Sequence, residues 1–536
     1  MNLAPLKTPL QTHVDTAFSA WGVEQLDAWI ASLRYNDPVV YGGTVYSALL
    51  NLNRTRLQQL SRYTVMERLR PVINDICAML IGRYRRSPLP LAAREQAEAD
   101  LVLRLYGELA TGFKIAVNDE ITRYLQQGDA PTALQLAIQR ALLSLGRVLL
   151  ECYRVYAPEP PLLWRDIHAL YRNSEQARLQ ALPLYAALDS DETALAIKQA
   201  YLRIAVLALS NPYHLLQGEA DELYRRIGRW VHFVQMRPAP TGGVAGTFAV
   251  DLDADLPARY FPSDLPLPTG GDLRILDLQQ LADALNEQIG TTSALLAAWR
   301  SGETLSMRMQ RDMYIRFRSA LTNRRERGSK RQPTLARLTV ALGLDASHAL
   351  LSGRQATATA DNKTVTLPAQ TTAQWNRKNE SDSGMALFCA KDSPLQAQVG
   401  ELVVYTAAEA ATAEAWQIGV IRWLRTRPNS GLELGIEQLA DSGHAVAIQT
   451  IADADRGRNR SLRGILTPRS GPSADTATLL APASAYTVDA TLRLQLRDRS
   501  TDIRLTELLE TTSLFAHFRF KLLKEADSPG DTALSA

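Results

Sequence analysis

The sequence contains few cysteines and has almost no net charge. Its three cysteines, Cys77, Cys152 and Cys389, lie far apart and form no C-x-x-C pair, which excludes a disulfide framework and a thiolate zinc site and fits a reducing cytoplasm. The 59 Lys and Arg residues are nearly balanced by 56 Asp and Glu, so bulk charge does not make the chain a nucleic-acid or membrane-surface binder. Any basic site must therefore be local.

Long apolar runs and catalytic motifs are missing as well. The first twenty residues lack the continuous apolar core of a secretory signal, and later apolar runs are interrupted well before the roughly 18 residues that a membrane span needs. We find no H-E-x-x-H, G-x-S-x-G, P-loop or paired-carboxylate motif. We therefore expect a soluble cytoplasmic protein with no membrane span, no catalytic residues, no metal and no enzymatic activity.

The N-terminal part is predicted to be helical. From about residue 22 to 234, apolar residues recur at helical spacing, and one stripe steps by three or four residues: Leu134, Ile138, Leu142, Leu145 and Leu149. Pro131 is placed where the first turn of that helix tolerates a missing amide. Pro-containing breaks cut the region into helical hairpins, so residues 1–234 are interpreted as an all-α domain and a possible scaffold. His168 is interpreted as a packed helical histidine.

Composition changes near residue 235 to Pro, Gly and Asp, which predicts a boundary. Residues 235–323 are interpreted as a linker that carries one short strand, at 246–252, and two helices, at 276–289 and 305–321.

After residue 331 the pattern becomes that of short strands. They are predicted at 335–342, 385–390, 402–406, 416–424, 432–436 and 445–450, and a second group at 464–466, 485–496, 503–508 and 514–523. The first group predicts an antiparallel barrel over 324–455 and the second a small β module over 456–524, with a disordered tail at 525–536. The fold class is thus multidomain α + β, with a helical-hairpin domain followed by two β modules.

A basic cluster precedes the first barrel strand. Between residues 300 and 337 there are eleven Lys and Arg against three acidic residues. Its densest part contains Arg324, Arg325, Arg327 and Arg331, and the Gly and Ser within it predict a loop. Guanidinium groups there can grip phosphates bidentately and hydrogen-bond or stack on guanine, although such a charge run can also be a solvated face.

A second polar motif leads into the strand at 385–390. Asn379, Ser381 and Gly384 have the spacing [D/N]-x-S-x-x-G. On an extended segment, side chains two residues apart point to the same side, so this amide and this hydroxyl can both contact a base edge or a phosphate. Gly384 allows the chain to turn and a ligand to approach the backbone.

The order of these elements carries a family resemblance. Arg327-x-x-x-Arg331, then the Asn379 motif, then the strands from Trp416 to Glu437 resemble a PilZ domain, the bacterial barrel that binds cyclic di-GMP. The strands and the helical segment at 163–171 are similar to those of PilZ proteins with a long helical N-terminal region, including the type IV pilus-associated FimW-like receptors.

The resemblance implies a ligand, the residues that hold it and a role. Arg327 and Arg331 match the arginines that hold guanine and phosphate, and Asn379, Ser381 and Gly384 match the motif that holds the other guanine face. Arg324 or Arg325 also contributes if the arginine register is shifted. The helical domain would bind a protein partner, and the family implies pilus or motility control. No cofactor beyond the ligand cyclic di-GMP is expected.

Two alternatives remain open from the residues alone. The same basic patch at 300–337 fits an RNA- or DNA-binding barrel, and a degenerate barrel on a helical scaffold would bind no nucleotide at all. The long polar segment at 352–374 is a departure from a compact PilZ barrel, and it leaves open whether the two motifs reach one pocket.

Overall fold

The computed structural model covers most of the chain. It describes residues 3, 5–12, 20–33, 37–127, 131–183, 195–240, 246–262, 271–298, 304–322, 332–352, 372–381, 383–407, 416–427, 430–452, 461–468, 477–497 and 499–523. The predicted disordered tail at 525–536 lies outside these residues.

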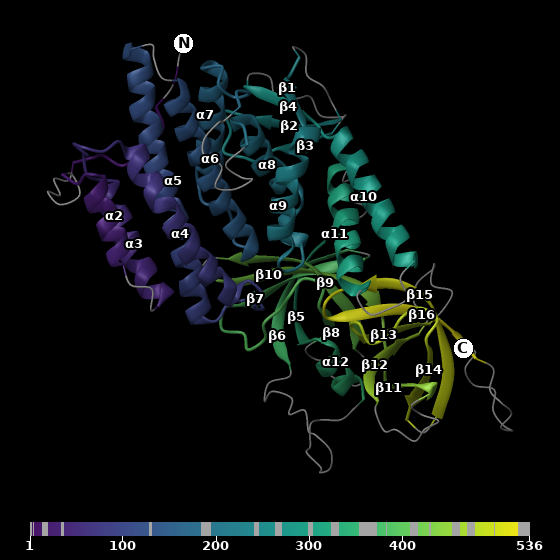
Figure 1. Ribbon diagram of the computed structural model, residues 1–536. Coiled ribbons are helices and arrows are strands. Elements are labelled where there is room, and N and C mark those ends of the chain that lie inside the picture. The colour runs from purple at the N-terminus through teal and green to yellow at the C-terminus, as the bar shows by residue number, and fades with distance from the viewer. Residues whose placement is uncertain are drawn as a thin grey trace. The chain divides into compact units, whose positions relative to one another are not determined.

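The chain forms two compact units. One comprises residues 1–290 with 314–326, and the other comprises residues 291–313 with 327–536. The first contains the helices α2–α9 and a small sheet, and the second contains two β-barrels (Figure 1). The predicted class, helices followed by two β modules, is confirmed.

The helices of the first unit, from α2 to α9, follow one another along the chain. Their bounds are α2 Val23–Ser32, α3 Pro38–Leu52, α4 Arg62–Tyr84, α5 Ala93–Gln127, α6 Pro131–Arg154, α7 Leu163–Gln176, α8 Ile197–Leu209 and α9 Glu219–Trp230. Local capping starts two of them: Asp37 accepts a bond from the Val39 amide at 3.1 Å, and Ser61 accepts one from the Thr64 amide at 3.1 Å.

The predicted apolar stripe lies on α6, the helix that begins at Pro131 as expected. All five of its residues are buried, from Leu134 to Leu149. Among the described residues α6 is the one helix long and apolar enough to cross a membrane, but 78% of its apolar window is buried inside the fold. The apolarity of α6 is thus explained by its place in the helical core.

The predicted packed histidine is confirmed on α7. His168 is fully buried, with Nε2 at 2.9 Å from the Leu256 carbonyl and Nδ1 at 3.0 Å from the Tyr201 hydroxyl. Burial lowers the pKa of His168 to about 4, so the ring is neutral near pH 7.

The region predicted as a linker with a single strand is instead a four-stranded sheet, which corrects that expectation. Its strands are β1 Gln235–Pro238, β2 Thr247–Asp251, β3 Arg259–Phe261 and β4 Leu273–Asp277, in the order β1-β4-β2-β3. Three of the strands were missed because each spans three to five residues between Pro, Gly and Asp, too few for a periodic pattern to show. The two predicted helices are present as α10 Gln279–Ala298 and α11 Thr304–Thr322.

The first barrel closes with six antiparallel strands in the order β10-β7-β6-β5-β8-β9. Their bounds are β5 Gln332–Leu342, β6 Ala373–Ser381, β7 Gly384–Ala390, β8 Leu402–Ala407, β9 Gln417–Arg427 and β10 Gly431–Ala440. A helix that the sequence analysis did not predict, α12 Leu344–Leu351, follows β5.

The second barrel also closes with six strands, in the order β11-β12-β13-β16-β15-β14. Their bounds are β11 His444–Thr450, β12 Leu462–Thr467, β13 Thr478–Pro482, β14 Thr491–Leu496, β15 Arg499–Thr511 and β16 Phe515–Leu522. The strand predicted at 445–450 is β11, which pairs with β12 and β14, so placing it in the first barrel was wrong. The pairing partner of a strand is a long-range property that its own residues do not specify.

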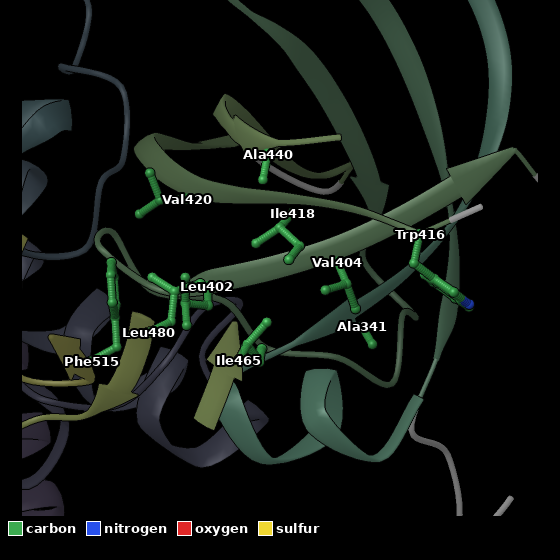
Figure 2. Close-up of a cluster of buried hydrophobic side chains, with 10 residues drawn as sticks. All are labelled: Ala341, Leu402, Val404, Trp416, Ile418, Val420, Ala440, Ile465, Leu480 and Phe515. Atoms are coloured by element: carbon green, nitrogen blue, oxygen red, sulfur yellow. The ribbon is translucent and has the colours of Figure 1, made fainter. Parts of the chain in front are cut away.

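The two barrels share a hydrophobic core (Figure 2). Leu402, Val404 and Ile418 of the first barrel pack in one cluster with Ile465, Leu480 and Phe515 of the second. A buried hydrogen bond joins them as well, from the Thr512 hydroxyl to the Gly400 carbonyl at 3.1 Å. The two barrels therefore behave as one packed body.

Truncating Phe515, which is fully buried in this shared core, is expected to destabilise the two-barrel unit. The Phe515→Ala variant should lose about 3–5 kcal/mol of unfolding free energy, because the cavity lies between two sheets that cannot collapse onto it. Leu522→Ala on the same strand is the control, since Leu522 is 60% exposed. Urea denaturation measures both, and a loss below about 1 kcal/mol for Phe515→Ala would contradict a shared core.

Glu401 makes the stability of the first barrel depend on pH. Burial raises the pKa of Glu401 to about 7, although a hydrogen bond from the Gln398 amide, at 3.0 Å, acts to lower it. Between the usual pKa of a glutamate, about 4.5, and about 7 the unfolded chain ionises Glu401 while the folded chain keeps the proton, so stability falls as the pH rises through this range.

Glu401→Gln is expected to remove that fall, because the amide keeps the acceptor without a charge. The variant should melt at a higher temperature than the wild type at pH 8 and at a similar temperature at pH 4.5. Thermal unfolding followed by circular dichroism measures this, with the exposed Glu507→Gln as a charge-matched control. Parallel pH profiles of wild type and Glu401→Gln would refute the assignment.

Candidate functional site

The polar motif of the sequence analysis lies on the tight hairpin between β6 and β7. Asn379 and Ser381 are on β6 and Gly384 begins β7, with Ser381 paired to Gly384 and Asn379 paired to Ala386. The structure therefore brings the three predicted residues together at one end of the first barrel.

Gly384 is needed because two strands approach each other closely there. A Cβ atom at this position would lie 2.1 Å from the Ile436 carbonyl oxygen and 3.2 Å from the Glu437 Cα, both on β10. Backbone cannot retreat as the end of a flexible side chain can, so a larger residue would push β7 and β10 apart. Gly384 thus serves the closure of the barrel as well as the turn.

The two polar side chains of the motif differ in how they are satisfied. The Ser381 hydroxyl donates to the Gly384 carbonyl at 3.1 Å, which holds the turn. The Asn379 side-chain oxygen is buried and has no hydrogen-bond partner among the described residues. Buried polar atoms are normally paired, so an orphaned amide oxygen is a feature of a site that receives a ligand or a water.

The strand that follows the arginine motif lies beside the Asn379 motif. Arg324, Arg325, Arg327 and Arg331 lie outside the described residues. Gln332, the residue after Arg331, begins β5 and pairs with Glu380, and Pro333 pairs with Asn379. The chain that carries the arginines thus enters the barrel on the strand next to the Asn379 motif.

The polar segment at 352–374 does not keep the two strands that flank it apart. Residues 353–371 lie outside the described residues. Nevertheless β5 and β6, the strands on either side of that segment, pair directly from Gln332–Glu380 to Val340–Ala373. The insertion therefore does not separate the strands that carry or follow the two motifs.

Sequence reasoning missed Arg377, which stands two residues before Asn379. A β-bulge lies between Arg377 and Asn379, and another lies opposite, between Pro333 and Ala336. Bulges re-aim side chains, and here they interrupt the alternation on both strands beside the motif. Arg377 forms an ion pair with Glu380, while its Nε is buried without a hydrogen-bond partner among the described residues.

Tyr405 on β8 adds another polar group of this kind. Its hydroxyl is buried and lacks a hydrogen-bond partner in the described part of the chain. Burial raises the pKa of Tyr405 and Asp441 raises it further, whereas the positive charge of Arg377 opposes the rise. Tyr405 pairs with Val340, and Val340 pairs with Ala373 at the start of β6, so the strand pairing does not place Tyr405 beside Asn379 and Ser381 at the end of β6.

Two further basic residues of the first barrel share one carboxylate. Lys378 and Arg427 both pair with Glu433, the latter at 2.7 Å. Burial disfavours ionisation of Glu433, but hydrogen bonds from Lys378 and Arg427 outweigh it and hold the pKa below its usual range. These two cations join strands, and Glu433 balances only one of their two positive charges.

Acidic residues compensate only part of the described basic patch at 300–337. On α11, Arg311 pairs with Asp312 at 2.9 Å and Arg316 with Glu219, whereas Arg318 donates to the neutral amide of Asn286 at 2.7 Å. Arg311 and Arg316 therefore add less to the positive charge that non-specific nucleic-acid binding requires, while Arg318 and the exposed Arg337 keep theirs.

Comparison with known families accounts for nearly the whole chain. Residues 24–240 match the model described as the cyclic-di-GMP receptor FimW, N-terminal domain. Residues 247–378 and 352–444 match the middle PilZ domain of the same receptor, and residues 446–523 match its C-terminal beta-barrel domain. The last match begins inside β11, in agreement with the assignment of that strand to the second barrel.

A curated relative extends along the full length of the chain. It is the cyclic-di-GMP receptor FimW of Pseudomonas aeruginosa, 23% identical over an alignment of 602 positions that covers 99% of this chain and 95% of the relative. The three domain matches occur in the order of the helical unit, the first barrel and the second barrel. The chain therefore belongs to the family of FimW-like cyclic-di-GMP receptors with a central PilZ domain.

Proposed function

We propose that the first barrel binds cyclic di-GMP between the segment that precedes β5 and the β6–β7 hairpin. Arg327 and Arg331 would hold guanine and phosphate, and Asn379 and Ser381 would hold the other guanine face, with Gly384 shaping the turn. Arg324 or Arg325 extends the grip in this proposal. The observation that carries it is the pairing of Gln332 with Glu380, since it supports a single cleft for two motifs far apart in the sequence.

The energetics of this contact set are sufficient for a cellular receptor. Each good bidentate arginine–guanine pair is worth about 1–3 kcal/mol and each stacked base a similar ~1–3 kcal/mol. A handful of them, after ordering costs, reaches about −8 kcal/mol, which is micromolar binding. The role is then binding rather than catalysis, and the name of the relative supports the same ligand.

The signal would pass from the hairpin to the second barrel. Gly384 pairs with Glu437, Glu437 forms an ion pair with Arg422, and Arg422 also holds Glu510 of β15, with its Nη2 at 3.0 Å from that carboxylate. A ligand that moves the hairpin therefore pulls on a bridge between the two barrels. The helical domain would carry the response to a protein partner in pilus or motility control. A cytoplasmic location fits the three free, buried cysteines, which stay reduced there.

Isothermal titration of the full chain with cyclic di-GMP tests the site. Arg327→Ala, Arg331→Ala and Asn379→Ala should each weaken binding by about tenfold or more, which corresponds to about 1.4 kcal/mol. Arg337→Ala is the matched control, because Arg337 is an exposed arginine on β5 outside both motifs. Absence of heat with the wild type, or affinity unchanged in the arginine variants, would refute the proposal. Salt-sensitive binding to any polynucleotide instead would favour the nucleic-acid alternative.

Gly384→Ala should differ from Asn379→Ala in its effect on stability. The added methyl group meets the Ile436 carbonyl, so Gly384→Ala should lose binding together with about 1–3 kcal/mol of unfolding free energy. Asn379→Ala removes an orphaned polar atom and should lose binding with little change in stability. Thermal unfolding beside titration separates the two, with Ser383→Ala in the same turn as the control. Equal melting temperatures for Gly384→Ala and the wild type would show that the close approach is not limiting.

A further inference from the structure

The helical unit contains a large cavity far along the chain from the motif residues. Its volume is about 1260 Å³, and its lining residues run from Arg70 on α4 to Arg229 on α9. Ligand pockets are commonly about 300–1,000 Å³, so this one has room for a molecule of nucleotide size.

Helix α6 lines the cavity with a row of cations. Arg140, Arg147 and Arg154 follow one another at intervals of seven residues, and all three line the cavity. Seven residues are close to two helical turns, so the three guanidinium groups share one face of the helix. Arg140 and Arg154 are buried and paired, Arg140 with Glu67 at 3.0 Å and Arg154 with Glu151 and Asp221.

The opposite wall repeats the arrangement on α8 and α9. Arg225 and Arg229 are one turn apart on α9, and both line the cavity with Arg203 of α8. The Arg203 guanidinium lies 3.6 Å from the centre of the Tyr224 ring, and its Nε donates to the Tyr224 carbonyl at 2.8 Å. These contacts fix Arg203 in place, so this wall is preorganised.

Arginines outnumber carboxylates in the described lining. With Arg70 and Arg85, eight arginines line the cavity, against the two aspartates Asp75 and Asp221. Some of these arginines are held in ion pairs by glutamates that lie outside the lining, namely Glu67, Glu151 and Glu222. Arg85 and Arg229 are exposed and form no ion pair among the described residues, so they are available to an anion.

Apolar residues also line the cavity, so its lining differs from a surface that carries charged groups alone. Ile81, Leu109, Leu143 and Leu150 are among its lining residues. Low-dielectric walls strengthen the field of the arginines inside and raise the local concentration of anions. A ligand with an organic body and several anionic groups matches both parts of the lining.

We propose that this cavity binds a small phosphate-bearing molecule of nucleotide size, at a site separate from the β6–β7 hairpin. Phosphate is the favoured chemistry because each group offers three oxygens and up to two charges, so a compact ligand engages guanidinium groups on facing helices bidentately. The proposal stands independently of cyclic di-GMP binding by the barrel.

Titration of the full chain with inorganic tripolyphosphate and with ATP tests the site. Tripolyphosphate supplies the charge alone, ATP adds an organic body, and citrate offers carboxylates with a lower total charge. We expect both phosphate compounds to bind more tightly than citrate. The double variant Arg85→Gln with Arg229→Gln should weaken phosphate binding by about tenfold or more, and these two arginines are exposed, so the fold is preserved.

The control double variant is Arg86→Gln with Arg104→Gln, two exposed arginines that do not line the cavity. It should bind within about twofold of the wild type, because neither arginine lines the cavity and substitutions of exposed residues elsewhere have small effects. A steric test complements it: Gly82→Trp fills the cavity from a position with open space around it, and Gly43→Trp does the same outside the cavity. Binding should be lost only in Gly82→Trp.

Several results would overturn the proposal. They are absence of binding by either phosphate compound, equal losses in the cavity and control variants, tighter binding of citrate, or retained binding in Gly82→Trp. Loss of tripolyphosphate binding in Arg331→Ala would place the anion at the barrel, which also refutes a separate site and leaves the barrel proposal standing.

Discussion

The close approach of β7 to β10 at Gly384 is the constraint on which the first barrel and its site depend. The Ile436 carbonyl occupies the space that any side chain at 384 would need, so the two strands can pair only with glycine there. That pairing closes the ring of strands and leaves β6 between β7 and β5. Because β6 has this position, the Asn379 motif lies beside the strand that directly follows the arginines.

The shared core of the two barrels makes this local geometry matter beyond the hairpin. Phe515 and its neighbours pack on the outer surface of the first barrel, and the Arg422 bridge joins strands of both barrels near Gly384. Packed cores shift between discrete arrangements rather than deforming continuously. In the proposed function, a ligand at the hairpin would therefore bias the second barrel without any hinge between the two.

Regular patterns in the sequence were sufficient for much of the fold. The stripe on α6 and the packed His168 follow from helical periodicity, and most barrel strands follow from short apolar runs between turn residues. The small sheet at 235–277 was missed because the turn-forming residues Pro, Gly and Asp surround its short strands. The strands β6 and β13 were not predicted either, β6 because most of its residues are polar, and α12 was missed because eight residues hold only two turns.

For the candidate site, the residue types and spacing of the Asn379 motif could be predicted, whereas the buried polar groups of Arg377 and Tyr405 could not. Neither belongs to a local motif: Arg377 stands beside a β-bulge, and Tyr405 is on β8, which β5 separates from β6. The clustering of arginines around the helical cavity could not be predicted either, because α4, α6, α8 and α9 come together only when the helices pack.

The sequence by itself determined the helical and strand segments, the family resemblance and the two motifs, because these depend on periodicity and spacing along a single stretch of chain. Only the tertiary structure decided that β11 belongs to the second barrel, that β5 pairs with β6 across a long insertion, and that arginines from four helices surround one hollow. Strand pairing and the packing of helices depend on contacts between segments far apart in the sequence. They are determined by the arrangement that buries the most apolar surface of the whole fold, so no local pattern encodes them.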